Sequence, residues 1–242
     1  SYVSSEVNLL APHIMGSGLP KAMASQTGDV NNEGNYLFVV NNDGTMGVFI
    51  TNRSEKVMAW TKFVTDGLIK DVAVVEDIVY MFVSRTWGGS TKYFIEALDD
   101  ENFTDSSIKK SQSSSASVSG LNHLDGKACR VRANSLSTAG SGNTNTVMAN
   151  ATPSSGSITV NRVVTDVEVG MNFDVTIKTM PASVALQSGP VSVKKRRISR
   201  VSAQLYESSG LQINGKAVPN KNLGSNVLGK PPEVFTGIKT LP

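Results

Sequence analysis

The sequence predicts an all-β protein of antiparallel strands, and three observations lead to that prediction. Between residues 36 and 97, short runs rich in apolar and β-branched residues recur at a spacing of about ten residues. Turn-forming pairs such as Asp43-Gly44 separate these runs. No amphipathic stretch of the ~10–15 residues that a crossover helix needs lies between them, which argues against a parallel α/β sheet. The pattern is typical of a meander, as in a propeller blade or a sandwich.

Turn chemistry bounds each strand of this first region. Residues 41–45 and 65–67 contain Asp-Gly pairs, whose glycine tolerates the positive φ that tight turns require. Glu76-Asp77 and Gly88-Gly89 supply two further reversals. The predicted strands span residues 36–40, 46–50, 57–63, 68–75, 78–83 and 91–97. They are enough for one propeller blade and part of another.

A second, smaller β region is predicted after a break in composition. Residues 106–119 are so rich in serine that they have almost nothing to bury, and we expect a linker or surface loop there. Short strands are predicted at residues 128–133, 146–149, 157–160, 164–169 and 172–180. In the last of these, Phe173, Val175 and Ile177 alternate with polar residues, which predicts one buried face.

The last part of the chain is rich in Gly, Pro and Asn and is expected to lie extended across other surfaces. Its only predicted strands are weak ones at residues 211–213 and 234–235. The chain therefore divides into a meander or blade-like region, a Ser-rich linker, a second β region and an extended tail. These divisions cover residues 1–105, 106–119, 120–215 and 216–242.

Composition places bounds on the protein's class. The chain has 242 residues and a formal net charge of +3, so it can bury a sizeable core and has little overall bias toward nucleic acid. A single cysteine, Cys129, excludes an internal disulfide. No apolar run approaches the ~20 residues of a membrane span, and no signal peptide pattern occurs, so no membrane insertion is expected. Because the chain does not begin with Met, we expect it to be a piece of a longer one.

The residues offer no catalytic constellation, and we predict that the protein is not an enzyme. The two histidines, His13 and His123, stand in no metal-ligand motif, and neither a nucleophile elbow nor a phosphate-binding loop occurs. The acidic turn at Asp99, Asp100 and Glu101 is interpreted as solvated surface rather than as a pair of catalytic carboxylates. We therefore expect no catalytic residue, no metal and no cofactor.

Two features are candidates for binding. One is a basic cluster that is interpreted as a solvated strand entry, a phosphate contact for passing DNA, or an ion-pairing surface for a neighbouring subunit. The cluster consists of Lys194, Lys195, Arg196, Arg197 and Arg200. The other is Trp87, which lies beside two glycines in a predicted turn and is a candidate ligand-facing aromatic.

A series of motifs runs in order through most of residues 6–215. The motifs lie at residues 6–14 (EVNLLAPHI), 42–45 (NDGT), 56–61 (KVMAWT), 65–67 (TDG), 72–75 (VAVV), 80–85 (YMFVSR), 92–96 (KYFIE), 120–127 (GLNHLDGK), 169–173 (VGMNF), 177–181 (IKTMP) and 194–206 (KKRRISRVSAQLY). In this order they resemble the nozzle, or tail tubular protein B, of short-tailed phages. Two departures stand out: family members are usually several times longer, and the region between Arg132 and Thr159 is short where relatives can carry a larger inserted β-barrel.

The resemblance implies a propeller-based ring, usually six-fold, that closes the distal end of the tail tube. DNA leaves through the lumen of such a ring, and fibres or adaptor proteins attach to its outside. The implied partners are further copies of the chain, most simply a hexamer, with the tail adaptor protein, tail fibres and non-specifically bound genomic DNA. The implied location is the virion, after synthesis in the host cytoplasm. The alternative is a β-rich receptor- or glycan-binding module of a tail tip, with Trp87 and the Ser/Gly loops presenting its site.

Overall fold

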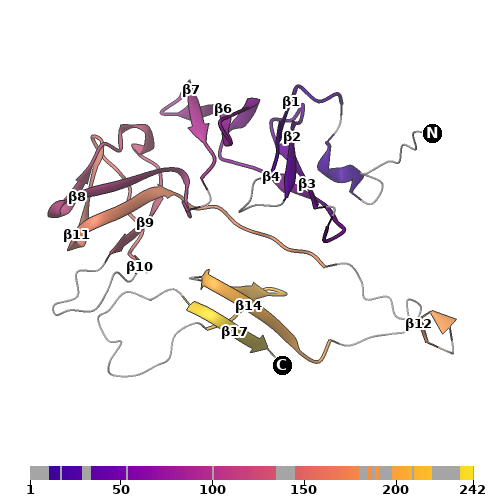
Figure 1. The fold of residues 1–242 in the computed structure, drawn as a ribbon. Helices are drawn as coiled ribbons and strands as arrows, with labels where there is room; N and C mark the ends of the chain where they lie inside the picture. The colour runs from indigo at the N-terminus through magenta and orange to yellow at the C-terminus, as the bar shows by residue number, and fades with distance from the viewer. Residues whose placement is uncertain are drawn as a thin grey trace. The chain divides into compact units, whose positions relative to one another are not determined.

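A computed structural model describes residues 11–16, 18–28, 34–52, 54–99, 101–134, 145–179, 185–186, 189–190, 198–208, 210–219 and 235–241. Antiparallel sheets joined by turns make up this part of the chain (Figure 1). Besides the strands it contains two single-turn 3-10 helices, η1 (Pro12–Ile14) and η2 (Asn122–Leu124), and within those ranges no α-helix. The predicted all-β class is confirmed. The chain divides into two compact units, Ser1–Phe103 and Thr104–Pro242.

The first sheet of the N-terminal unit is a four-stranded antiparallel meander. Its strands β1 (Ala22–Gln26), β2 (Asn35–Val40), β3 (Met46–Asn52) and β4 (Val57–Phe63) lie in chain order. The β2–β3 turn uses the predicted Asp-Gly pair: Gly44 has a φ of 82°, and Thr45 N–H donates to Asp43 Oδ1 at 3.0 Å. β1 was not predicted, because its sequence has neither β-branched nor aromatic residues.

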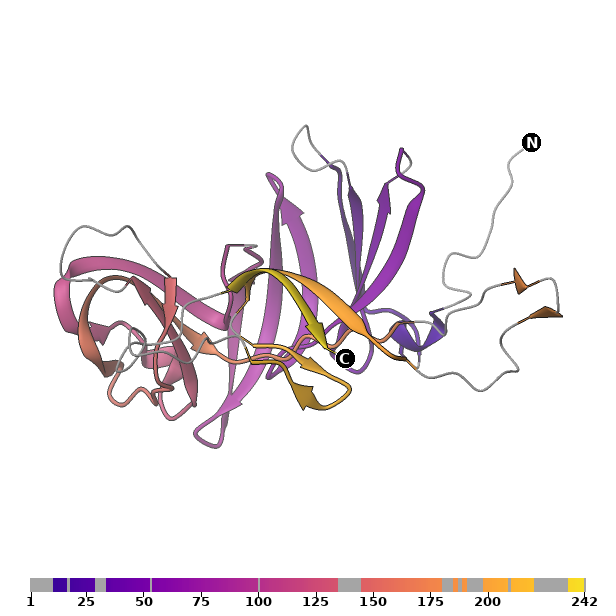
Figure 2. The ribbon, with the colours of Figure 1, turned by 90° about the horizontal axis from the view of Figure 1, so that it is seen from below.

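The second sheet of this unit is a three-stranded meander, visible beside the first in Figure 2. Its strands are β5 (Leu68–Val75), β6 (Ile78–Trp87) and β7 (Ser90–Ala97), again in chain order. Both two-residue turns have positive φ at both positions: 48° and 62° at Glu76-Asp77, and 60° and 77° at Gly88-Gly89. Positive φ at both central residues matches the right-handed twist of the flanking strands, so these turns fix the register of the meander.

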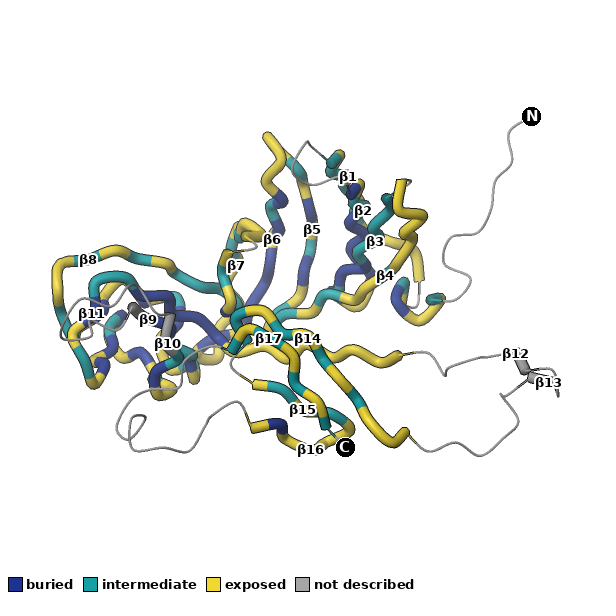
Figure 3. The backbone as a smooth tube through the Cα atoms, turned by 60° about the horizontal axis from the view of Figure 1, so that its bottom comes forward, coloured by how far each residue is buried: buried dark blue, intermediate teal, exposed yellow. Residues whose placement is uncertain are grey.

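One hydrophobic core joins the two sheets. Side chains of β2 and β3 pack against side chains of β5 and β6, and the buried residues of these strands are dark blue in Figure 3. The backbone connects the sheets as well, since Ile69 N–H donates to the Gly44 carbonyl oxygen at 2.8 Å. The core residues are Phe38, Val40, Met46, Ile69, Val72, Val79, Met81 and Val83.

A short N-terminal segment covers the opposite face of the first sheet. Ile14 of η1 is buried, and a Cβ atom placed on Gly47 would lie 3.4 Å from Ile14 Cγ2 and from Trp60 Cζ3. The segment is held by Asn41 Nδ2, which donates to the Ile14 carbonyl oxygen at 2.9 Å. The first sheet is therefore packed on both faces.

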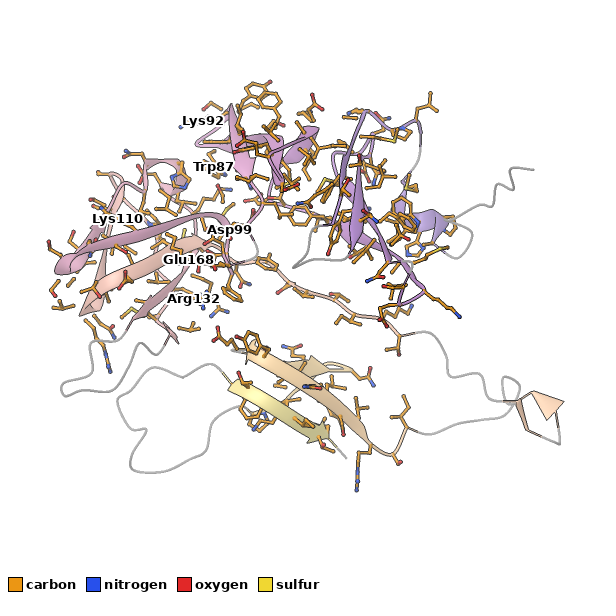
Figure 4. The ribbon with its side chains drawn as sticks, in the orientation of Figure 1. Trp87, Lys92, Asp99, Lys110, Arg132 and Glu168 are labelled. Atoms are coloured by element: carbon orange, nitrogen blue, oxygen red, sulfur yellow. The ribbon has the colours of Figure 1, made fainter. Side chains whose placement is uncertain are left out.

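The second unit contains a four-stranded antiparallel sheet with strand order β10-β9-β11-β8. Its long strands are β8 (Asp105–Ser119) and β11 (Ser157–Met171), and its short ones are β9 (Cys129–Asn134) and β10 (Asn145–Val147). A buried ion pair joins β9 to β11, with Arg132 Nη1 2.9 Å from Glu168 Oε2. Both residues are labelled in Figure 4. The apolar core of this unit includes Val118, Leu121, Leu124, Cys129, Val131, Val164, Val167 and Val169.

The prediction of a linker over residues 106–119 is wrong, because these residues form most of β8. β8 pairs with β11 along its length, with Ile108 opposite Val169 and Val118 opposite Ile158. It is an edge strand, so one side of its backbone pairs with β11, while most of its serine side chains stay in contact with water. Low apolar content therefore did not prevent strand formation. β11 also merges the two strands predicted at residues 157–160 and 164–169.

The strand predicted at residues 172–180 is not formed. β11 ends at Met171, and residues 172–179 belong to no strand of the described structure, while Met180 lies outside the described residues. Phe173, Val175 and Ile177 are 48%, 75% and 84% exposed. The alternation of apolar and polar side chains is present, but the described residues supply no surface that buries it.

The C-terminal part contains more strand than the predicted tail over residues 216–242. β14 (Val201–Ser208) pairs with β17 (Phe235–Leu241), and Val201 lies opposite Leu241. β15 (Gln212–Ile213) and β16 (Lys216–Ala217) form a small hairpin, as do β12 (Ala185–Leu186) and β13 (Gly189–Pro190). Of the weak strand predicted at residues 234–235, Phe235 begins β17 and residue 234 lies outside the described residues. The rest of β17 was missed because its partner β14 lies well before it in the chain, and short-range patterns do not report such pairing.

Candidate interaction surface

The face of the β5–β7 sheet that points away from the core carries apolar side chains on all three strands. Side chains alternate along a strand, so the register places Ala73, Tyr80 and Ala97 in one row and Phe82 and Ile95 in the next. Val75 and Ile78 extend this face beside the β5–β6 turn. We call these residues, together with Tyr93, the outer face.

Much of the outer face is in contact with water in the described structure. Phe82, Tyr93 and Ile95 are 40%, 61% and 76% exposed. The rings of Phe82 and Tyr93 stack with centroids 5.5 Å apart and planes 11° from parallel. Soluble proteins rarely leave such a contiguous apolar patch uncovered unless a partner covers it. The first sheet has no equivalent patch at its centre, because η1 covers it.

The outer edge of the same sheet lies on β7. Leu98 N–H donates to the Val79 carbonyl oxygen, which continues the β6–β7 ladder beyond the end of β7. In an antiparallel pair, hydrogen-bonded and non-hydrogen-bonded residues alternate. The backbone groups of Tyr93 and Ile95 therefore point away from β6, and no strand among the described residues pairs with them. The residues with the most exposed side chains are thus also the residues that present backbone donors and acceptors.

The inner side of β6 and β7 is rigid. Arg85 is fully buried and binds Glu96 with two hydrogen bonds, from Nε to Oε1 at 2.8 Å and from Nη2 to Oε2 at 2.7 Å. Its Nη1 also donates to the Asp66 carbonyl oxygen at 2.8 Å. A two-point contact of this kind fixes the orientation of both side chains, so it holds β7 in place beside β6.

Trp87 belongs to this inner side and does not face a ligand. Its side chain is 5% exposed, lies 5.1 Å from the ring of Phe94 and has the Arg85 guanidinium 5.9 Å from its centroid. The sequence placed Trp87 in a turn, but β6 extends to this residue and turns its ring inward. The expectation of a ligand-facing aromatic at this position is corrected accordingly.

The basic cluster is described only in part. Lys194, Lys195, Arg196 and Arg197 lie outside the described residues. Arg200 is exposed and immediately precedes β14. The prediction that the cluster contacts DNA or a neighbouring subunit stays a prediction.

Of the other residues considered for chemistry, Asp100 lies outside the described residues, and Asp99, His123 and Cys129 have structural partners. Asp99 caps its own turn, accepting from Glu101 N–H at 2.9 Å and from Asn102 Nδ2 at 3.1 Å. His123 Nε2 lies 3.1 Å from the Ser106 carbonyl oxygen. Cys129 is buried, and burial raises the pKa of its thiol to about 11, so little of the reactive thiolate forms near neutral pH.

Within the described ranges, no three His, Cys, Asp or Glu side chains gather closely enough to hold a metal ion. The same part of the chain has no helix of the length and hydrophobicity that crossing a membrane would take. Comparison with protein-family profiles and with curated proteins found no match to the chain.

The outer face was not singled out from the sequence, although a signal for it existed. Residues 93–95 are Tyr-Phe-Ile, so apolar side chains occupy both faces of β7 rather than one. Strands that are apolar on both faces are typical of sheets that are covered on both sides. The core of the N-terminal unit covers one face of β7. A cover for the other face was not predicted from the sequence.

Proposed function

We propose that the chain is a structural subunit of a phage tail tube, a nozzle-like protein that assembles into a ring around a DNA exit channel. In this role it attaches fibres or adaptor proteins on its outside and resides in the virion. The observation that carries the proposal is the outer face with its adjoining β7 edge. A rigid β-sheet whose second apolar face is exposed is suited to packing against another subunit.

A ring is the assembly that we propose for this surface. A contact between the outer face of one copy and a different surface of the next copy is heterologous. Heterologous contacts generate closed rings when the rotation between neighbours closes. Each added copy contributes a formal charge of +3, so a ring of copies would carry a positive net charge that attracts DNA. The ordered motifs at residues 6–206 support the assignment to a tail nozzle.

The burial of Trp87 argues against the receptor- or glycan-binding alternative. It assigned the sugar-stacking role to Trp87, whose ring is buried between Arg85 and Phe94. No other feature of the described residues favours a glycan site over a subunit contact.

The proposal is tested on phage particles from the strain that encodes the chain. Antibodies raised against the purified chain are used for immunogold labelling, and the particle proteins are identified by mass spectrometry. We expect peptides of the chain in purified particles and gold at the distal end of the tail. Absence of the chain from purified particles would overturn the proposal, and gold on fibres alone would favour the receptor-binding alternative.

A further inference from the structure

The described structure contains an open sheet edge and a segment that belongs to no described strand. The edge is the outer side of β7, where Tyr93 and Ile95 present backbone groups and exposed side chains. The segment is residues 172–179, which follow β11 and belong to no described strand. We infer that residues 172–179 of one copy pair with β7 of a second copy, adding a fourth strand to its β5–β7 sheet.

The side-chain pattern of the segment matches the edge. Phe173, Val175 and Ile177 all project from one side of an extended chain, because alternate residues share a face. When that side continues the outer face, Phe173 and Val175 lie beside Ile95 and Tyr93, and Ile177 lies beside Thr91. Asp174, Thr176 and Lys178 then lie on the other face. A segment that alternates in this way gains both backbone hydrogen bonds and apolar burial on joining an edge.

Charge selects the register of the added strand. An antiparallel register with Val175 opposite Ile95 would place Asp174 opposite Glu96 and Lys178 opposite Lys92, and like charges directly opposite are destabilising. Shifting by two residues places Phe173 opposite Ile95 and Val175 opposite Tyr93. Asp174 then lies opposite Phe94, with Lys92 and Glu96 on its two diagonals, and Lys178 lies opposite Ser90, so no like charges are directly opposite. We therefore assign the second register.

The added strand would be a fourth strand of the second sheet, which would then have as many strands as the first. The first sheet has four strands, and the second has three within the described residues. The β8 and β4 edges are open too, but β8 is mainly serine and β4 exposes Lys62 and Thr61 beside its apolar residues. The β7 edge combines open backbone groups with a continuous apolar face. This pairing does not rest on the tail-tube assignment, because it requires only that copies of the chain meet.

The pairing is tested with two single-cysteine variants of the full chain, Val175→Cys and Tyr93→Cys. They carry tags of different size and are coexpressed, so a short bismaleimide can join positions 175 and 93 only across two copies. The native Cys129 is buried in every variant, and the parent chain measures its background. We expect a cross-linked product whose mass is the sum of the two tagged chains.

The matched control replaces Val175→Cys with Thr176→Cys, whose side chain lies on the opposite face of the strand. We expect several-fold less cross-linked heterodimer at position 176. Equal yields at both positions, or no heterodimer at position 175, would overturn the inference. It would also be overturned if a chain carrying both Val175→Cys and Tyr93→Cys cross-linked only within monomers.

Self-association supplies a readout without cysteine chemistry. Ile95→Asp places a charge on the exposed outer face, where it leaves the core of the monomer intact. Sedimentation velocity is expected to show a shift of this variant toward monomer at concentrations where the parent chain associates. Leu19→Asp is the control, because Leu19 is also apolar and highly exposed but does not belong to the outer face. Equal association of the two variants would contradict the assigned surface.

Discussion

At the scale of single residues, Arg85 is the side chain on which the position of β7 depends most directly. Its guanidinium is fully buried and bound to the Glu96 carboxylate and the Asp66 carbonyl oxygen. Arg85→Met removes one partner and leaves a largely buried carboxylate, which typically costs about 3–5 kcal/mol of unfolding free energy. Urea unfolding measures this loss.

Lys62→Met is the control, because the Lys62–Asp43 pair is solvent-exposed and such pairs contribute about 0–1 kcal/mol. Equal losses in both variants would contradict the role assigned to Arg85.

Asp43 gives the β2–β3 turn a pH dependence whose sign can be worked out. The Thr45 hydroxyl and Thr45 N–H hydrogen-bond its carboxylate, and with Lys62 nearby they hold the pKa of Asp43 below its ordinary value of 3.8. A lowered folded pKa means stability that is present above the unfolded pKa and is lost as the pH falls through the folded one. The stability advantage of the parent chain over Asp43→Asn should therefore shrink on acidification below about pH 4.

The cause of that pKa shift is separately testable. Thr45→Val keeps the Asp43 carboxyl but removes the hydroxyl that forms its strongest hydrogen bond. NMR titration should show that the Asp43 pKa rises toward 3.8 in this variant. An unchanged pKa would show that the hydroxyl does not stabilise the carboxylate.

At the scale of elements, β8 and residues 172–179 both differ from what their compositions predict. β8 is serine-rich but paired with β11, whereas residues 172–179 alternate like a strand but are exposed. Hydrogen exchange measured on dilute, monomeric chain should find protected amides within residues 106–119 and fast exchange within residues 172–179. Exchange of residues 106–119 at the rate of an unstructured peptide would contradict the β8 assignment. Raising the concentration should protect residues 172–179 if they pair with a second copy.

These two elements show what the sequence could and could not predict. The β2–β7 meanders were predictable because each strand and its turn are specified locally, as at Asp43-Gly44 and Gly88-Gly89. β8 and β17 depend on partners distant in the chain, and local patterns carry no information about them. Trp87 failed as a candidate because its burial depends on Arg85 and Phe94, which no motif connects. The outer face needed the register of three strands before its residues formed one surface.

At the scale of the whole molecule, the proposed assembly depends on the apolar surface that the core of the N-terminal unit leaves open. The N-terminal unit has one apolar core, and it also carries apolar side chains on the outer face of the β5–β7 sheet, which η1 does not cover. A subunit of a ring needs such a face, because each copy must offer a surface that its neighbour buries. In the proposed ring, the formal charge of +3 on each copy would add up over the assembly.

The basic cluster allows the last prediction, which concerns DNA at the level of the assembled protein. If the cluster contacts phosphates, the double variant Lys194→Glu and Lys195→Glu should bind duplex DNA more weakly than the parent chain. Its affinity should also depend less steeply on salt, since fewer counterions are released for each protein bound. Fluorescence anisotropy over a salt series measures both quantities. The charge-matched control is Lys109→Glu and Lys110→Glu in β8, which changes the net charge equally at another place. If both double variants lose the same affinity and slope, net charge rather than the basic cluster determines DNA binding.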